Sequence, residues 1–149
     1  MLILDIPTTP SGMHNGGKVL IGPDQTLYLT VGDLFTHRTQ AQNFKNGTSA
    51  DAISVIYRIK LDGKARADNP LDTSQPLNKF YAYGITNGFG IDFDPVTGEL
   101  WDTENGVDLN DEINLVEPGF NSGWSLIQGL AKDKPHFDPI NDLVNLGLN

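Results

Sequence analysis

Apolar and polar residues alternate over short stretches of the chain, and turns rich in glycine, proline, asparagine and aspartate separate these stretches. Two segments share one plan, in which an apolar run at 19–21 or 91–93 leads into a turn that contains proline, and a return run completes a hairpin. Further strands are predicted at 54–61, which ends in an Asp-Gly turn, and at 81–83. The pattern favours an all-β fold with antiparallel sheets.

A long connection separates the two hairpins, because they lie further apart than the roughly 40 to 50 residues of one propeller blade. The polar segment 34–51 follows neither the strand period nor the helix period, so we expect it to be a loop inserted outside the sheets. After Trp124 the alternation fades. Residues 131–149 are predicted to form an irregular C-terminal tail with one short helix near 140–146, and residues 1–130 to form the folded unit.

The charge of the chain narrows its expected partners. Acidic side chains outnumber basic ones, 19 to 10, and the formal net charge is −9. Such a chain repels phosphate backbones and anionic lipids, so we expect neither nucleic acid nor a membrane surface as a partner. The absence of cysteine excludes disulfides and thiolate metal sites. The first residues carry no signal-peptide pattern, and the sequence leaves the compartment open.

One histidine and one aspartate are candidates for acid–base chemistry. His14 lies in a glycine-rich segment before the first predicted strand, and Asp33 follows the return strand, so the hairpin brings the two ends close together. A carboxylate that orients an imidazole makes a general base that works near neutral pH. The simpler interpretation is that His14 is a solvated loop residue and that Asp33 caps a turn after Gly32. His37 and His136 are predicted to be surface residues.

The segment 104–112 is a second candidate site, because it holds several closely spaced carboxylates. Oxygen-rich loops suit calcium, which takes six to eight oxygen ligands from carboxylates, carbonyls and water. Neighbouring carboxylates also repel one another unless a cation lies among them. The spacing is not that of an EF-hand, and a solvated acidic loop explains the same composition.

The stretch 81–124 combines a strand pair, a polar loop between glycines, an acidic cluster and an aromatic turn. Together with the segments 14–17 (His-Asn-Gly-Gly) and 31–33 (Val-Gly-Asp), it resembles the glucose/sorbosone dehydrogenase family. Members of that family are six-bladed β-propellers and include soluble quinoprotein sugar dehydrogenases. The resemblance covers residues 2–129, which correspond to a central portion of the family domain.

The resemblance implies a reaction and a set of site residues. The family oxidises a sugar CH–OH group and passes hydride to pyrroloquinoline quinone (PQQ), so a sugar or another small polyol is the expected substrate. By position, His14 is implied to be the base that takes the hydroxyl proton, and Asp33 supports it. The remaining implied roles are cofactor contacts by Asn87, Asn105 and Gly106, a cofactor-bound calcium facing the carbonyls of Gly106 and Val107, and a structural calcium held by Glu112 and the carbonyl of Ser122.

The sequence also departs from the family pattern. Quinone-using members typically read Gly-His-Arg-Asn-Pro-Gln-Gly where this chain reads Gly-Ile-Thr-Asn-Gly-Phe-Gly at 84–90. Thr86 thus replaces an arginine and Phe89 replaces a glutamine, both of which reach the cofactor in the family. Because a tricarboxylated quinone needs cationic partners, this change weakens the expected PQQ site. Val107 and Ser122 also replace Pro and Tyr, but a carbonyl ligand tolerates both changes.

The length of the chain limits how much of a propeller it forms. We expect two to three four-stranded blades, which is too few to close a six-bladed ring and leaves sheet edges open to self-association. One hypothesis is therefore a truncated, quinoprotein-like dehydrogenase module that turns over only with blades from another copy or another chain. The second is a non-catalytic, calcium-stabilised β module that acts in assembly or partner binding. A third is a piece of an open reading frame without an independent role.

Overall fold

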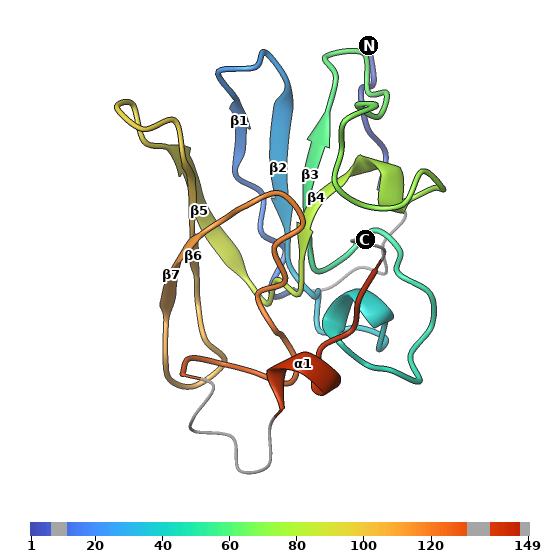
Figure 1. Cartoon of the computed structure of the whole chain (residues 1–149), viewed down its shortest axis with the longest axis vertical. Coiled ribbons are helices and arrows are strands. Elements are labelled where there is room, and N and C mark those ends of the chain that lie inside the picture. The colour runs from blue at the N-terminus through green and yellow to red at the C-terminus, as the bar shows by residue number, and fades with distance from the viewer. Residues whose placement is uncertain (7–11, 131–137, 147–149) are drawn as a thin grey trace.

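The computed structural model describes residues 1–6, 12–130 and 138–146, and its main feature is a pair of antiparallel sheets packed face to face (Figure 1). The first sheet has the strand order β1-β2-β3-β4 and the second the order β5-β6-β7. The strands are β1 (Val19–Ile21), β2 (Leu27–Val31), β3 (Val55–Ile59), β4 (Phe80–Tyr83), β5 (Gly88–Phe93), β6 (Leu100–Glu104) and β7 (Glu112–Leu115). Two 3₁₀ helices, η1 (Gln40–Gln42) and η2 (Leu77–Lys79), and one α-helix, α1 (Pro139–Asp142), complete the described elements.

The predicted hairpins are confirmed. β1 pairs with β2 through Val19 and Leu29, and β5 pairs with β6 through Phe93 and Leu100. β7 was not predicted; it is only four residues long, and its apolar residues Ile113 and Leu115 are the exposed ones, while Glu112 and Asn114 are half-buried. The chain therefore forms one four-stranded and one three-stranded sheet, at the lower end of the expected number of blades.

The segment 34–51 forms no strand, as predicted, yet it is not a solvated loop. Leu34, Ala41 and Ala50 are buried, and they pack with Val55 and Phe80 over the face of the first sheet that points away from β5–β7. Burial of a large apolar side chain contributes roughly 1.5 to 3 kcal/mol. The inserted segment therefore stabilises the first sheet.

The C-terminal part of the chain is described only in part. Helix α1 starts one residue before the predicted helix and ends at Asp142, earlier than the expected 146. Leu146 is buried in the same cluster as Phe80, so this segment packs on the core. Residues 131–137, which include His136, lie outside the described residues, as do 147–149.

No helix in the described part of the chain is long and apolar enough to span a membrane.

The interface between the sheets forms a second apolar cluster. Tyr28, Ile56 and Ala82 from the first sheet meet Ile91 and Leu100 from the second. The first sheet is thus covered on both faces. The opposite face of the second sheet is uncovered, and its exposed apolar side chains are Trp101, Ile113 and Leu115.

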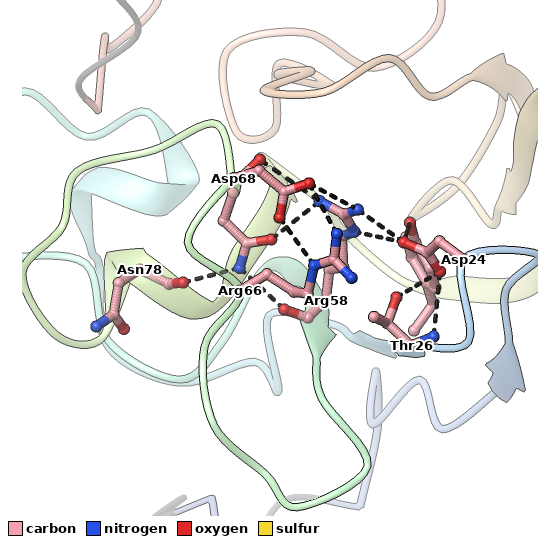
Figure 2. A network of polar contacts seen from close by, with 8 residues as sticks. Asp24, Thr26, Arg58, Arg66, Asp68 and Asn78 are labelled. Carbon is pink, nitrogen blue, oxygen red and sulfur yellow. Dashed lines mark hydrogen bonds and ion pairs between the residues drawn. The ribbon is translucent and has the colours of Figure 1, made fainter.

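A charged network ties the β1–β2 turn to β3 and to the loop that follows it (Figure 2). Arg58 is central, because its Nη2 lies 2.7 Å from Asp24 Oδ2 and 3.3 Å from Asp68 Oδ2. Burial acts to raise the pKa of Asp24, but hydrogen bonds from Thr26 and Arg58 outweigh it and hold that pKa below its usual value. Arg66 joins only the outer part of the network, through Asp68.

Replacement of Arg58 by Met is expected to lower the free energy of unfolding by about 2 kcal/mol, because it leaves the partly buried Asp24 carboxylate without its charged partner. Urea titration at neutral pH measures the change. Arg66→Met is the matched control, because Arg66 pairs with Asp68 at the exposed surface, and such pairs contribute about 0 to 1 kcal/mol. Equal losses in the two variants would contradict a central role for Arg58.

Candidate functional site

Three segments that carry predicted site residues meet at one end of the sheets. Gly32 lies between them, because a Cβ atom at this position would stand 2.2 Å from the backbone oxygen of His14 and 2.7 Å from that of Thr86. The N–H of Asp33 donates to the same Thr86 oxygen at 2.9 Å. The loop before β1, the end of β2 and the β4–β5 connection are therefore in direct backbone contact.

His14 and Asp33 form a close pair within this meeting point. The distance from His14 Nδ1 to Asp33 Oδ1 is 2.7 Å, and the side chains are only 12% and 7% exposed. The interpretation of His14 as a solvated loop residue is therefore wrong. Because Nδ1 faces Asp33, Nε2 is the ring nitrogen that points away from the carboxylate and is available to exchange a proton with another group. The catalytic role of the pair stays a prediction.

The other histidine in the described part of the chain with a close carboxylate is His37. Its Nε2 lies 2.5 Å from Asp51 Oδ2, but its side chain is 48% exposed. It is a surface residue, as predicted. This second pair provides a natural control for His14, because the residue types match while the burial differs.

Two buried carboxyl groups beside the site were missed in the sequence. Glu104 accepts hydrogen bonds from the Thr86 N–H at 2.8 Å, from Asn114 at 3.3 Å and from the Ser122 hydroxyl. Asp102 is 1% exposed, and its carboxylate has no well-formed hydrogen bond, although the neighbouring Asn114 acts to lower its pKa. Burial raises the pKa of both groups, the charge of Glu112 raises it further in both, and Asp102 also raises the pKa of Glu104.

A signal for these two groups was present in the sequence. Side chains on a strand point alternately to opposite faces, so Asp102 and Glu104 share the face of the apolar Leu100. Leu100 is 3% exposed and packs between the sheets. Glu104 was predicted only as part of an acidic loop, whereas its position at the end of β6 places it in the interior.

Most of the predicted calcium contributors lie around a small recess of about 10 Å³. Gly106, Glu112 and Ser122 line it together with Glu104, while Val107 does not and is 39% exposed. Glu112 accepts a hydrogen bond from the Gly129 N–H. Within residues 1–6, 12–130 and 138–146, no group of three or more His, Asp or Glu side chains is arranged to hold a metal ion.

The predicted cofactor contacts lie next to one another. The Asn105 N–H donates to the Asn87 backbone oxygen at 3.1 Å, and the Asn87 side-chain oxygen is buried without a hydrogen-bond partner. Thr86 is 5% exposed and Phe89 is 63% exposed. Neither side chain is charged, so neither supplies a cation. The recess is lined by polar, acidic and apolar residues, without lysine or arginine. These residues do not fit a tricarboxylated quinone by themselves.

The family model described as Glucose / Sorbosone dehydrogenase matches residues 1–138. An uncharacterized protein of Synechocystis is 35% identical over an alignment of 130 positions that covers 80% of this chain and 30% of that protein. Quinoprotein glucose dehydrogenase B of Acinetobacter calcoaceticus is 32% identical over an alignment of 145 positions that covers 89% of this chain and 30% of that protein. This chain therefore spans about a third of the length of these relatives.

The fold agrees with these relatives. The PQQ-bound aldose sugar dehydrogenase of Streptomyces coelicolor superposes with a TM-score of 0.68 at 30% identity, over 85% of this chain and 34% of that one. The two sheets are therefore blades of a partial β-propeller, as the sequence predicted. Because the family model covers most of its length, the chain belongs to the glucose/sorbosone dehydrogenase family.

Proposed function

We propose that the chain supplies the general base of a sugar dehydrogenase site. The observation that carries this proposal is the buried contact between His14 and Asp33, held between two loops at one end of the sheets. In the proposed reaction, His14 Nε2 accepts the proton of a sugar hydroxyl, and Asp33 stabilises the imidazolium that forms. A quinone held by further blades would take the hydrogen on the same carbon together with its electron pair, and the alcohol would become a carbonyl.

The acceptor has to be held outside the residues described for this chain. Thr86 and Phe89 provide no charge, and the recess beside them is too small and too acidic for a tricarboxylate. Quinoprotein glucose dehydrogenase B and the PQQ-bound aldose sugar dehydrogenase are each about three times as long as the region that matches this chain. The proposed site is thus divided between this chain and further blades.

A fusion protein tests the proposed base. In it, this chain replaces the matching segment of the Acinetobacter calcoaceticus enzyme, so that the remaining blades are present. We expect glucose oxidation by the fusion and a loss of at least 100-fold in rate for His14→Gln, the size of a typical general-base contribution. His37→Gln is the matched control and leaves the rate unchanged. A fusion whose rate does not respond to His14→Gln would rule out this role.

We also propose that calcium binds beside the acidic loop. The donor set supports it, because Glu104, Glu112, Gly106 and Ser122 line the recess and provide oxygen ligands without a lysine or arginine among them. A bound calcium ion would offset the mutual repulsion of these carboxylates. The Val107 carbonyl belongs to the same proposal through the family resemblance alone.

Calcium is expected to raise the melting temperature of the chain, by an amount that corresponds to about 2.7 kcal/mol at 100 times its dissociation constant. Glu112→Gln should remove this response, because it takes away a charged ligand. Thermal unfolding with calcium and with chelator measures it. Glu117→Gln is the control, since Glu117 is exposed and lies outside the recess. A calcium response that survives Glu112→Gln would place the ion elsewhere.

The free face of the second sheet supports a proposal of self-association. Trp101, Ile113 and Leu115 are 38%, 73% and 37% exposed on that face. Apolar sheet faces of this kind normally pack against another layer, and a second copy of the chain offers one. The molecular mass in solution tests this point, because a monomer at micromolar concentration would rule it out.

A non-catalytic β module is the alternative function. The specific observation in its favour is the buried, uncharged Thr86, which fills the position of the family arginine and bonds to Glu104 through its backbone. In this function the sheets and the proposed calcium site serve assembly or binding of a partner. The fusion protein separates the two functions, because this alternative predicts no glucose oxidation.

Restoring the family residues tests why the quinone site is incomplete. The double variant Thr86→Arg, Phe89→Gln is expected to bind PQQ no more than weakly in the isolated chain, because one added guanidinium cannot balance three carboxylates and the recess stays small. In the fusion, the same double change is expected to strengthen PQQ binding at least tenfold, as a charge-assisted pair forms. Calorimetric titration measures both. Strong PQQ binding by the isolated double variant would instead show that two side chains were the whole obstacle.

A further inference from the structure

Phe35 lies beside the His14–Asp33 pair and has no role in the function proposed above. Its ring centroid is 4.6 Å from that of His14, with an edge-to-face angle of 70°. The N–H of Phe35 donates to Asp33 Oδ1 at 3.1 Å, and this oxygen also contacts His14. One carboxylate therefore fixes the aromatic ring and the imidazole relative to each other.

The backbone that presents Phe35 is strained. Leu34 and Phe35 have φ values of 54° and 53°, in the left-handed region that residues with side chains rarely adopt. Leu34 is 4% exposed and anchors the segment in the core, whereas Phe35 is 55% exposed. Strain of this kind persists where the surroundings hold a functional geometry. Here it places a large aromatic ring in solvent next to the partly buried His14.

We propose that Phe35 forms the apolar wall of the substrate site and packs against the C–H face of a sugar ring. A pyranose has hydroxyl groups around its rim and apolar C–H groups on its faces, so it offers a hydroxyl to His14 and a face to Phe35 at once. Aromatic rings favour such contacts, and binding sites combine apolar walls with a few polar groups. This inference rests on the proposed function, and it names cyclic sugars over open-chain polyols as the substrate class.

The test is a titration of the whole chain with D-glucose, followed by the NMR signals of the His14 and Phe35 side chains. Saturable shifts of both residues are expected. Phe35→Ala should weaken glucose binding at least tenfold, and Phe35→Trp should retain it, because indole also offers an aromatic face. Sorbitol, an open-chain polyol without a rigid C–H face, should bind at least tenfold more weakly than glucose to the wild-type chain.

Val96→Ala is the control. Val96 is 91% exposed on the β5–β6 turn, so this substitution also removes exposed apolar surface, but away from His14. It should bind glucose as the wild type does. Equal affinity of Phe35→Ala and wild type, equal affinity for glucose and sorbitol, or a Phe35 signal that does not respond to glucose would each overturn the proposal. The last result is expected if Phe35 instead packs against a further blade.

The glucose titration and the activity of the fusion protein can give different answers, so they test the role of Phe35 and the proposed function separately. If the fusion oxidises glucose through His14 while Phe35→Ala binds glucose normally, the proposed role of Phe35 is wrong and the proposed role of His14 as the base is supported. If the isolated chain binds glucose through Phe35 while the fusion is inactive, the chain is a sugar-binding module without the proposed chemistry.

Discussion

A Glu104→Gln variant is expected to be more stable than the wild-type chain at pH 8 and nearly equal to it at pH 5. Burial raises the pKa of Glu104, and the neighbouring Asp102 raises it further. The folded state therefore favours the protonated carboxyl. Its contribution to stability is fully present below the ordinary value of 4.5 and is lost as the pH rises through the folded value of about 8.

Glutamine keeps the shape of the protonated carboxyl and does not ionise, so it removes this loss. One pKa unit corresponds to about 1.4 kcal/mol, and we expect a stabilisation on the order of 2 to 4 kcal/mol at pH 8. Urea titrations at pH 5 and pH 8, with chelator present, measure it. Glu99→Gln is the control, because Glu99 is exposed on the same hairpin. Identical pH dependence of Glu104→Gln and wild type would show that Glu104 is not buried as described.

Replacement of Gly32 by alanine is expected to lower the free energy of unfolding by on the order of 3 kcal/mol, because the added methyl group overlaps fixed backbone atoms. The new Cβ would lie 2.2 Å from the His14 oxygen and 2.7 Å from the Thr86 oxygen. One of these segments has to move, so the contact between His14 and Asp33 should be lost as well. Urea titration and the NMR signals of His14 measure the two effects.

Gly12→Ala is the matched control for this variant. A Cβ atom at Gly12 meets no atom within 4 Å, so its effect on the free energy of unfolding should stay within about 0.5 kcal/mol. A Gly32→Ala chain that is as stable as Gly12→Ala, with His14 undisturbed, would contradict the close packing of the three segments.

The hairpins were predictable from the sequence, because their turns and their strand period are local signals. The approach of His14 to Asp33 was predictable for the same reason, since one hairpin joins them. Burial of segment 34–51 was not predictable, because it depends on tertiary contacts such as that of Leu34 with the first sheet. The interior position of Glu104 was missed because carboxylates are rarely buried. That general tendency argued against the alternation along the strand, which puts Glu104 on the same face as Leu100.

The family resemblance supplied the roles of the site residues, and the structure shows how far this chain carries them. Gly106, Glu112 and Ser122 lie around one recess, but Val107 lies outside it. Thr86 and Phe89 leave the region without a cation, which was visible in the sequence from two substitutions. What the sequence did not indicate is the strained segment at Leu34 and Phe35, because neither residue type signals a left-handed backbone.

Calorimetric titration with PQQ in the presence of calcium, with the molecular mass recorded at each step, tests most directly whether the site is divided between this chain and further blades. We expect no saturable PQQ binding by the isolated chain, either as a monomer or after self-association, and saturable binding by the fusion that restores the remaining blades. Saturable PQQ binding by the isolated wild-type chain would contradict it, because the residues around the recess would then suffice to hold the quinone.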